Sequence, residues 1–136
     1  MATVEDVLSR LKSLSPDESG LEGMARFGIA IEQRLGVSDP DMRKVAKELG
    51  KDHQLALGLW KTGIAEAKMV ASMVDEPDKV TGQQMEEWVK GFNSWDVCDQ
   101  VCDNLFQKTP LVWKKVIAWS EREEEFVKRA AFALIA

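Results

Sequence analysis

The stretch Thr81–Pro110, TGQQMEEWVKGFNSWDVCDQVCDNLFQKTP, decides the fold, because it contains two helix signals in succession. Thr81 followed three residues later by Gln84 is a capping-box pattern, which predicts a helix start. Ser94 stands before a second run of residues with helical spacing and is a favoured N-cap. We therefore predict a pair of helices in this stretch, over residues 81–91 and 94–107.

This pair is one period of a repeat along the chain. Helix starts near Asp52, Thr81 and Pro110 are each 29 residues apart. Each of these helices is followed by a partner, and the partners start near Ile64, Ser94 and Glu121. Helix pairs that recur at a fixed period are typical of solenoids, in which each pair buries its apolar faces against its neighbours. We expect a curved α-solenoid whose second helices form a continuous concave wall.

The rest of the chain carries helix signals of the same kind. Each of the four prolines lies where a helix can begin, and no segment shows the alternation of a β-strand. Ser38 before Pro40 marks a helix start, Gly50 marks an αL stop, and Thr109 before Pro110 marks another start. Ser120 with Glu123 repeats the capping-box pattern. The sequence predicts an all-α protein of about nine helices, at residues 3–15, 18–35, 40–49, 52–62, 64–74, 81–91, 94–107, 110–119 and 121–135.

Length and composition indicate one globular domain over residues 1–136. A chain of 136 residues can bury a real core, and 45% hydrophobic with 30% charged residues is ordinary for such a domain. No apolar run approaches the ~20 residues that a membrane span needs. The amphipathic N-terminus, MATVEDVLSRLKSL, lacks the layout of a secretory signal. We expect a cytoplasmic protein with no membrane contact.

Charge argues against a DNA-binding surface spread over the whole protein. The formal net charge is −5, and from Glu66 to Asp103 nine acidic residues outnumber three basic ones. Affinity for nucleic acid rests mainly on Lys and Arg that neutralise phosphates. Basic residues gather before and after this segment, and among them Arg43 and Lys44 are candidates for phosphate contacts. Such charges also occur on helix faces that are simply solvated.

The two cysteines, Cys98 and Cys102, are spaced i, i+4 on one predicted helix. This spacing places them poorly for a disulfide, so we interpret them as reduced thiols packed as small hydrophobic residues. The only histidine, His53, is far away in the sequence, and we expect neither a metal nor another cofactor. A thiol or metal site at this pair is the open alternative.

Trp95 and Asp99 are the candidate functional residues of the helix over 94–107. They lie one turn apart on one face, whereas an apolar stripe on a different face is directed to the core: Val97, Val101 and Leu105. Asp99 is too deep in the helix for a capping role, whereas Asp96 suits one and Asp103 suits a solvated position. Arg129 lies on the second helix of the next pair, so the three side chains are expected to share a groove.

Each of these residues also has a structural interpretation. Trp95 can be a core anchor, as we expect of Trp60, Trp88, Trp113 and Trp119. Arg129 can form an ion pair with Glu125 at i−4, which contributes only a few tenths of a kcal/mol, about the strength of a surface contact.

Three segments resemble the AlkD-like family of DNA alkylation repair glycosylases, which are built from HEAT-like helical repeats. The segments are GMARFGIAIEQRLGVSDPDMRKVAKEL at 23–49, SWDVCD at 94–99 and FVKRAAFAL at 126–134. Their order and spacing extend the resemblance over essentially the whole chain. The resemblance implies that Asp99 is the catalytic carboxylate, that Trp95 packs against the sugar of the damaged nucleotide, and that Arg129 contacts the DNA backbone. Phe27 stands where the family often has a tyrosine that touches DNA.

The activity implied by the resemblance is hydrolysis of the N-glycosidic bond of cationic N3- or N7-alkylated purines in double-stranded DNA, without base flipping. The sequence departs from the family in its acidic balance. It also ends at AAFALIA, inside an amphipathic helix, where the family continues through further repeats. We therefore expect the N-terminal part of a longer family architecture. A non-catalytic helical-repeat scaffold, which binds protein or nucleic acid through its concave face, is the alternative.

Overall fold

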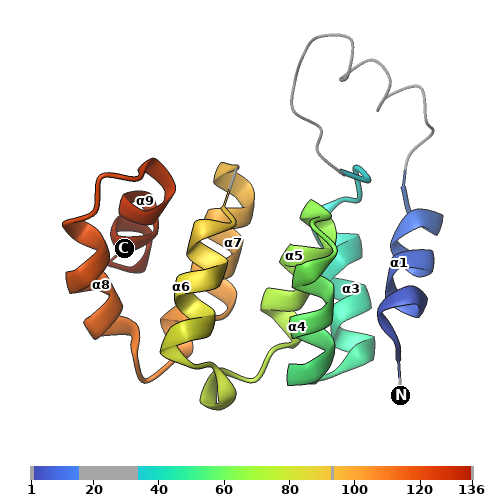
Figure 1. Ribbon diagram of the computed structural model, residues 1–136. Coiled ribbons are helices and arrows are strands. Elements are labelled where there is room, and N and C mark those ends of the chain that lie inside the picture. The colour runs from blue at the N-terminus through green and yellow to red at the C-terminus, as the bar shows by residue number, and fades with distance from the viewer. Residues whose placement is uncertain (1, 16–33, 93, 136) are drawn as a thin grey trace, which may run out of the picture. The chain divides into compact units, whose positions relative to one another are not determined.

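The computed structural model describes residues 2–15, 34–92 and 94–135, and every regular element in these ranges is a helix (Figure 1). The predicted all-α class is confirmed there. The predicted helix over 18–35 lies outside the described residues except for its last two positions, which are not helical. The α-helices are α1 (Val4–Ser13), α3 (Asp39–Leu49), α4 (His53–Lys61), α5 (Ala65–Val74), α6 (Gly82–Lys90), α7 (Trp95–Asn104), α8 (Val112–Ser120) and α9 (Glu125–Ile135). Two single-turn 3₁₀ helices, Pro77–Lys79 and Phe106–Lys108, lie between them.

The predicted repeat of helix pairs is present along the chain. The second helices α5, α7 and α9 begin at Ala65, Trp95 and Glu125, so successive starts are 30 residues apart. The chain divides into two compact units, residues 1–74 and residues 75–136. None of the helices in the described part is both long and apolar enough to cross a membrane.

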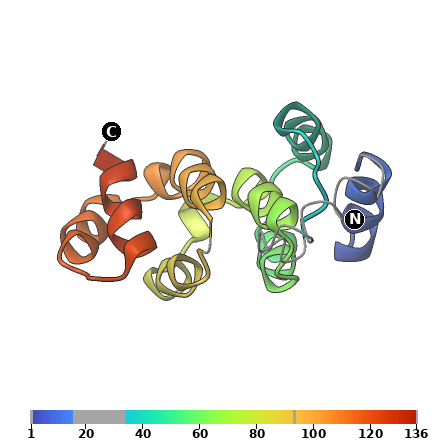
Figure 2. The same ribbon diagram turned by 90° about the horizontal axis from the view of Figure 1, so that it is seen from above.

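In the first unit, α5 packs against α3 and α4 and also contacts α1 (Figure 2). It is buried along almost its entire length, because small residues such as Ala67 and Ala71 allow neighbouring helices to approach on several sides. Helix α1 approaches α4 at Gly58, where a Cβ atom would lie 2.8 Å from the Val4 Cγ2 atom. Close packing of three helices around α5 therefore forms this core.

A buried carboxylate of α5 fixes the segment that leads into α3. Glu66 is 2% exposed, and its Oε1 atom accepts a hydrogen bond of 2.8 Å from the backbone N–H of Leu35. Its Oε2 atom accepts from the N–H groups of Gly36, at 2.8 Å, and Val37, at 3.3 Å. Three backbone donors thus compensate one buried carboxylate. This contact places Ser38, whose hydroxyl caps α3 at the N–H of Asp41.

We predict that Glu66→Ala destabilises the protein by at least about 3 kcal/mol, because three backbone donors lose their acceptor at once. Glu66→Gln should cost about 1–2 kcal/mol, since its amide group retains only one accepting oxygen. Urea unfolding followed by circular dichroism measures both values. The control is Glu48→Gln on the exposed face of α3, and equal stabilities of the Glu48 and Glu66 variants would contradict the role of Glu66.

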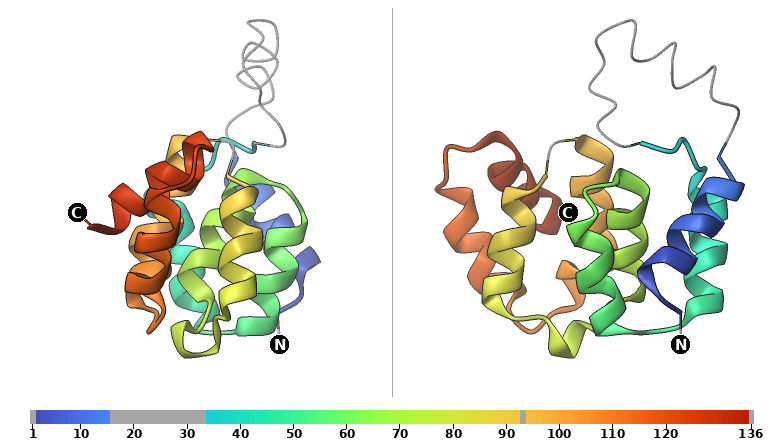
Figure 3. Two further views of the ribbon diagram at one scale, coloured as in Figure 1. Left: turned by 60° about the vertical axis from the view of Figure 1, so that its left-hand side comes forward. Right: turned by 45° about the vertical axis from the view of Figure 1, so that its right-hand side comes forward.

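The second unit has an aromatic core, in which α9 packs against α6, α7 and α8 (Figure 3). Phe106 lies at the centre of this core, with ring centroids 6.3 Å from Trp88, 6.3 Å from Phe92 and 5.8 Å from Trp119. Trp88, Phe106 and Trp119 are almost completely buried. Aromatic pairs at such distances contribute beyond the area that they bury.

Glu86 of α6 connects this core to α8 through polar contacts. Its Oε1 atom accepts hydrogen bonds from the Lys115 ammonium at 2.8 Å and the Trp119 indole at 3.0 Å, and Arg122 lies 3.6 Å from Oε2. Burial favours a raised pKa for Glu86, but the hydrogen bonds from Lys115 and Trp119 and the two nearby cations outweigh it. The pKa of Glu86 is therefore lowered from its ordinary value of 4.5.

A lowered pKa in the folded state means that Glu86 stabilises the fold above about pH 4.5, and that this contribution is lost as the pH falls through the folded-state pKa. We expect Glu86→Gln to cost about 1–2 kcal/mol at pH 7 and much less at pH 3. Unfolding curves at the two pH values test this, with the exposed neighbour variant Glu87→Gln as control. A loss of the same size at both pH values would contradict an electrostatic role.

Local helix signals were confirmed in part. The Thr81 hydroxyl caps α6 at the N–H of Gln84, but the side chain of Gln84 binds Asp75, at 2.6 Å, and does not complete a capping box. Gly50 ends α3 with a φ of 72°, as predicted for a glycine stop, although its ψ of −165° lies outside the αL region.

Two predicted helix starts were wrong. Thr109 does not cap α8, which begins at Val112, because its hydroxyl donates to the carbonyl of Phe106. Ser120 is the last residue of α8, where its hydroxyl donates to the carbonyl of Ile117, and α9 begins only at Glu125. The predicted capping box of Ser120 and Glu123 therefore does not form.

The predictions for the core tryptophans were also confirmed only in part. Trp88 and Trp119 are core residues as predicted, and Trp60 is half-buried. Trp113 was predicted to be a core residue, but it is 67% exposed, because α8 buries the face that carries Val116 and Trp119.

Candidate functional site

Helix α7 has the two faces that its sequence predicts. Val97, Val101 and Leu105 are fully buried, which confirms the core stripe. Trp95 is 53% exposed and so is not a core anchor. Asp99, one turn further along, keeps 40% of its side-chain surface exposed. An indole and a carboxylate are thus available to solvent on a helix whose opposite side is completely buried.

The two cysteines determine how closely α7 approaches α9. The Cys98 thiol lies 3.8 Å from the carbonyl oxygen of Phe126, and the Cys102 thiol lies 3.9 Å from that of Ala130. Both cysteines are free and fully buried, which confirms their interpretation as packed thiols. The hydrogen bond with Cys98, together with burial, raises the pKa of the Cys102 thiol well above its ordinary value. Small side chains here allow the two helices to approach closely.

This close approach brings Arg129 of α9 onto Asp99. The guanidinium forms two hydrogen bonds with the carboxylate, Nε to Oδ1 at 3.2 Å and Nη2 to Oδ2 at 3.1 Å. The Arg129 Cζ atom also lies 4.2 Å from the centre of the Trp95 ring, in a cation–π contact. The hydrogen bonds that Arg129 donates to Asp99 raise the pKa of Arg129, so it remains cationic. The structure therefore brings together the three residues expected to share a groove.

Arg129 pairs with Asp99 rather than with Glu125 in the described part of the chain. The alternative ion pair within α9, between Arg129 and Glu125, is therefore not the one that forms; the pair instead connects α9 with α7. A bidentate arginine–carboxylate pair fixes both groups in direction as well as in distance.

An apolar hollow of about 180 Å³ lies beside this cluster. Phe126, in its wall, contacts Trp95 edge-on with ring centroids 6.4 Å apart. The hollow is lined by Val89, Lys90, Phe92, Glu124, Glu125, Phe126 and Val127. Trp95 therefore stands between the carboxylate of Asp99 and a partly aromatic surface.

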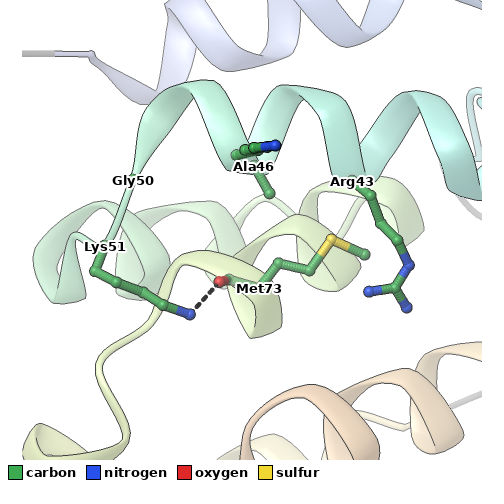
Figure 4. Close-up of a pocket in the computed structure, with 6 residues that line it drawn as sticks. Arg43, Ala46, Gly50, Lys51 and Met73 are labelled. Carbon is green, nitrogen blue, oxygen red and sulfur yellow. Dashed lines mark hydrogen bonds between the residues drawn. The ribbon is translucent and has the colours of Figure 1, made fainter.

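The other candidates for DNA contact, besides Arg129, lie in the first unit or outside the described residues. Arg43 and Lys44 are exposed on α3, and Arg43 pairs with Asp39 at 2.9 Å. Arg43 also lines a hollow together with Lys47 and Lys51, whereas Lys44 is not part of its lining (Figure 4). The sequence did not single out Lys47 and Lys51 as contacts, although their spacing from Arg43 places them along one helix face. Phe27 lies outside the described residues.

The described residues contain no group of three or more His, Cys, Asp or Glu side chains placed to hold a metal ion. The chemistry available at the Trp95–Asp99–Arg129 cluster is that of a carboxylate, a guanidinium and an indole face.

Comparison with known protein families shows to which family the chain belongs. The family described as "DNA alkylation repair enzyme" matches residues 7–136. The chain belongs to this family. The match confirms the resemblance found in the sequence and associates the protein with DNA repair. A search of curated proteins gives no significant match.

A solved structure has the same fold. It comes from "a new family of proteins related to the HEAT-like repeat DNA glycosylases with affinity for branched DNA structures", and superimposes with a TM-score of 0.82 at 18% sequence identity. The match covers 98% of this chain and 56% of that chain. The predicted HEAT-like fold is thereby confirmed, and the chain spans little more than half the length of this relative.

The packing of α7 on α9 can be tested at Cys98. A leucine at this position should force α9 away from α7 and cost about 1–3 kcal/mol, because this interface has no room for a larger side chain. Cys98→Ala should cost less, since it leaves only a small void. Chemical unfolding measures both variants. A leucine variant as stable as the alanine variant would show that the helices are not held in close contact here.

Proposed function

We propose that this chain provides the catalytic side chains of a DNA glycosylase, which hydrolyses the N-glycosidic bond of cationic N3- or N7-alkylated purines in duplex DNA. The observation that carries this proposal is the exposed Asp99 carboxylate, held by Arg129 beside the face of Trp95, in a member of the DNA alkylation repair family. Hydrolysis of such substrates needs few protein groups, because the alkylated base is already a good leaving group.

The reaction requires stabilisation of positive charge on the sugar. As the bond from C1′ to the base nitrogen breaks, its electron pair neutralises the cationic base, and the sugar becomes oxocarbenium-like. A carboxylate at the position of Asp99 opposes this charge and orients the attacking water. Water forms the new bond to C1′, and its proton passes to the carboxylate or to solvent. The electron-rich face of Trp95 favours the same cationic sugar.

Arg129 serves this site as a positioning residue with spare donors. It engages each Asp99 oxygen once, and each oxygen of a carboxylate has a second lone pair for water or substrate. Two of the five guanidinium N–H groups are used in these bonds, so three remain for a phosphate of the DNA backbone. The proposed backbone contact of Arg129 is therefore compatible with its bond to Asp99.

The position of the cluster supports action on a stacked base. Enzymes that extrude a base receive it in a fitted pocket. Trp95, Asp99 and Arg129 instead lie on the exposed faces of two adjacent helices, and each keeps more than a third of its surface exposed. Such a surface suits a sugar approached from outside the duplex, so we propose hydrolysis without base flipping.

A second candidate function is binding of DNA without hydrolysis. It is favoured by the engagement of both Asp99 oxygens by Arg129, which competes with substrate for the carboxylate. The relative described as having affinity for branched DNA structures gives this candidate a specific ligand.

The deciding experiment measures release of N7-methylguanine from a methylated duplex by the full chain. We expect Asp99→Asn to lower the rate of release by at least about 100-fold, because the amide cannot oppose the oxocarbenium charge. The matched control is Asp103→Asn, an exposed carboxylate one turn further along α7, which should keep the rate of the unaltered protein.

Equal release by both variants would overturn the catalytic role of Asp99. If the unaltered protein releases no base but binds a four-way junction more tightly than a linear duplex, the second candidate is correct. Binding should then not be weakened by Asp99→Asn at a salt concentration common to all variants, because the substitution removes a negative charge beside Arg129.

A further inference from the structure

The first unit contains a hollow that the proposed catalytic cluster does not use. It has a volume of about 340 Å³ and lies between α3 and the C-terminal end of α5. Figure 4 shows Arg43 and Lys51 on either side of Met73, with Ala46 above. The lining residues are Arg43, Ala46, Lys47, Gly50, Lys51 and Met73, so three of six are cationic and none is acidic.

The positive charge of this hollow follows from the spacing of α3. Arg43 and Lys47 are four residues apart and so lie on one face of the helix, about 6 Å apart along its axis. Lys51 continues this row just beyond the end of α3. Arg43 and Lys51 lie on opposite sides of Met73, so the positive charge is spread along the hollow (Figure 4).

None of the three acidic residues of α3 lines the hollow. Glu48 forms its ion pair with Arg10 of α1, outside the hollow. Asp39 pairs with Arg43, but both side chains are about half exposed. Such surface ion pairs contribute little, so a phosphate can replace Asp39 as the partner of Arg43 at small cost.

Small residues keep the hollow open. Ala46 and Gly50 provide the α3 side of the lining without a long side chain, and Gly50 turns the chain with a φ of 72°. Lys51 is fixed at the edge, where its Nζ atom donates to the carbonyl oxygen of Met73 at 2.7 Å. An ammonium group has three N–H donors, so two remain for a ligand.

We infer that this hollow binds backbone phosphates of a DNA strand through Arg43, Lys47 and Lys51. This inference rests on the proposed function only in taking DNA as the ligand. A protein of net charge −5 gains little affinity for a polyanion from its overall charge, so binding requires a local concentration of cations. An open, elongated cationic row fits consecutive phosphates better than it fits one free anion.

The test is the salt dependence of binding to an unmodified, fluorescently labelled duplex, measured by anisotropy with the full chain. The slope of log K against log salt is negative, and each lost phosphate contact should make it less steep by about 0.9. We expect this change for Lys47→Ala and twice this change for the double variant of Lys47→Ala with Lys51→Ala. Lys61→Ala, at the exposed end of α4 in the same unit but outside the hollow, is the matched control and should change the slope much less.

Two further measurements separate phosphate binding by these lysines from an effect on stability or on catalysis. Because Lys51 also binds the end of α5, the thermal stability of each variant is measured, and Lys51→Arg should restore the slope. In the Asp99→Asn background, which should release no base, Lys47→Ala should still change the slope by the same amount. Loss of release with unchanged slopes in the lysine variants would overturn the inference and leave the proposed function standing.

Absence of duplex binding by the unaltered protein at low ionic strength would also overturn the inference. A competition with inorganic phosphate at matched ionic strength gives a further test. The inference would also be overturned if phosphate displaced the duplex from the unaltered protein but not from the double variant. That result would identify a site for a free anion.

Discussion

The close packing of α7 against α9 is the constraint on which the candidate site depends. Cys98 and Cys102 contact the backbone carbonyls of Phe126 and Ala130, so a spacing of four residues on α7 matches a spacing of four on α9. This match fixes the register of the two helices. Asp99 adjoins one of these contacts, and Arg129 adjoins the other, so their bidentate pairing follows from the register. Helix α7 thus carries two buried cysteines that pack against α9 and an exposed face with an indole and a carboxylate.

The sequence predicts what local chemistry and periodicity determine. Ser38 and Thr81 begin helices as expected because a hydroxyl and a backbone N–H three residues later suffice for a cap. The cluster of Trp95, Asp99 and Arg129 was predictable because second helices recur every 30 residues and helical spacing places the three side chains on corresponding faces. The contacts within the cluster were not predictable from the sequence, because the distance between α7 and α9 decides whether Arg129 pairs with Asp99 or with Glu125.

Predictions failed where a tertiary contact outweighed a local signal. Helix α8 has apolar residues around most of its circumference, so its sequence does not determine which face is buried. Contacts of Trp119 with Phe106 and Glu86 select one face, and Trp113 is left exposed. The same contacts extend α8 to Ser120, which removes that residue from its predicted role as a cap. The hollow in the first unit also depends on a tertiary contact. Its basic residues Arg43, Lys47 and Lys51 line a hollow only because Met73 of α5 forms the other side.

The burial of the two thiols has a consequence for survival under chemical attack. Agents that methylate purines also react with cysteine, but only the thiolate is strongly nucleophilic. Cys98 and Cys102 are inaccessible to solvent, and the raised pKa of Cys102 keeps its sulfur protonated. The packing that aligns α7 with α9 therefore also shields the sulfur atoms from electrophiles.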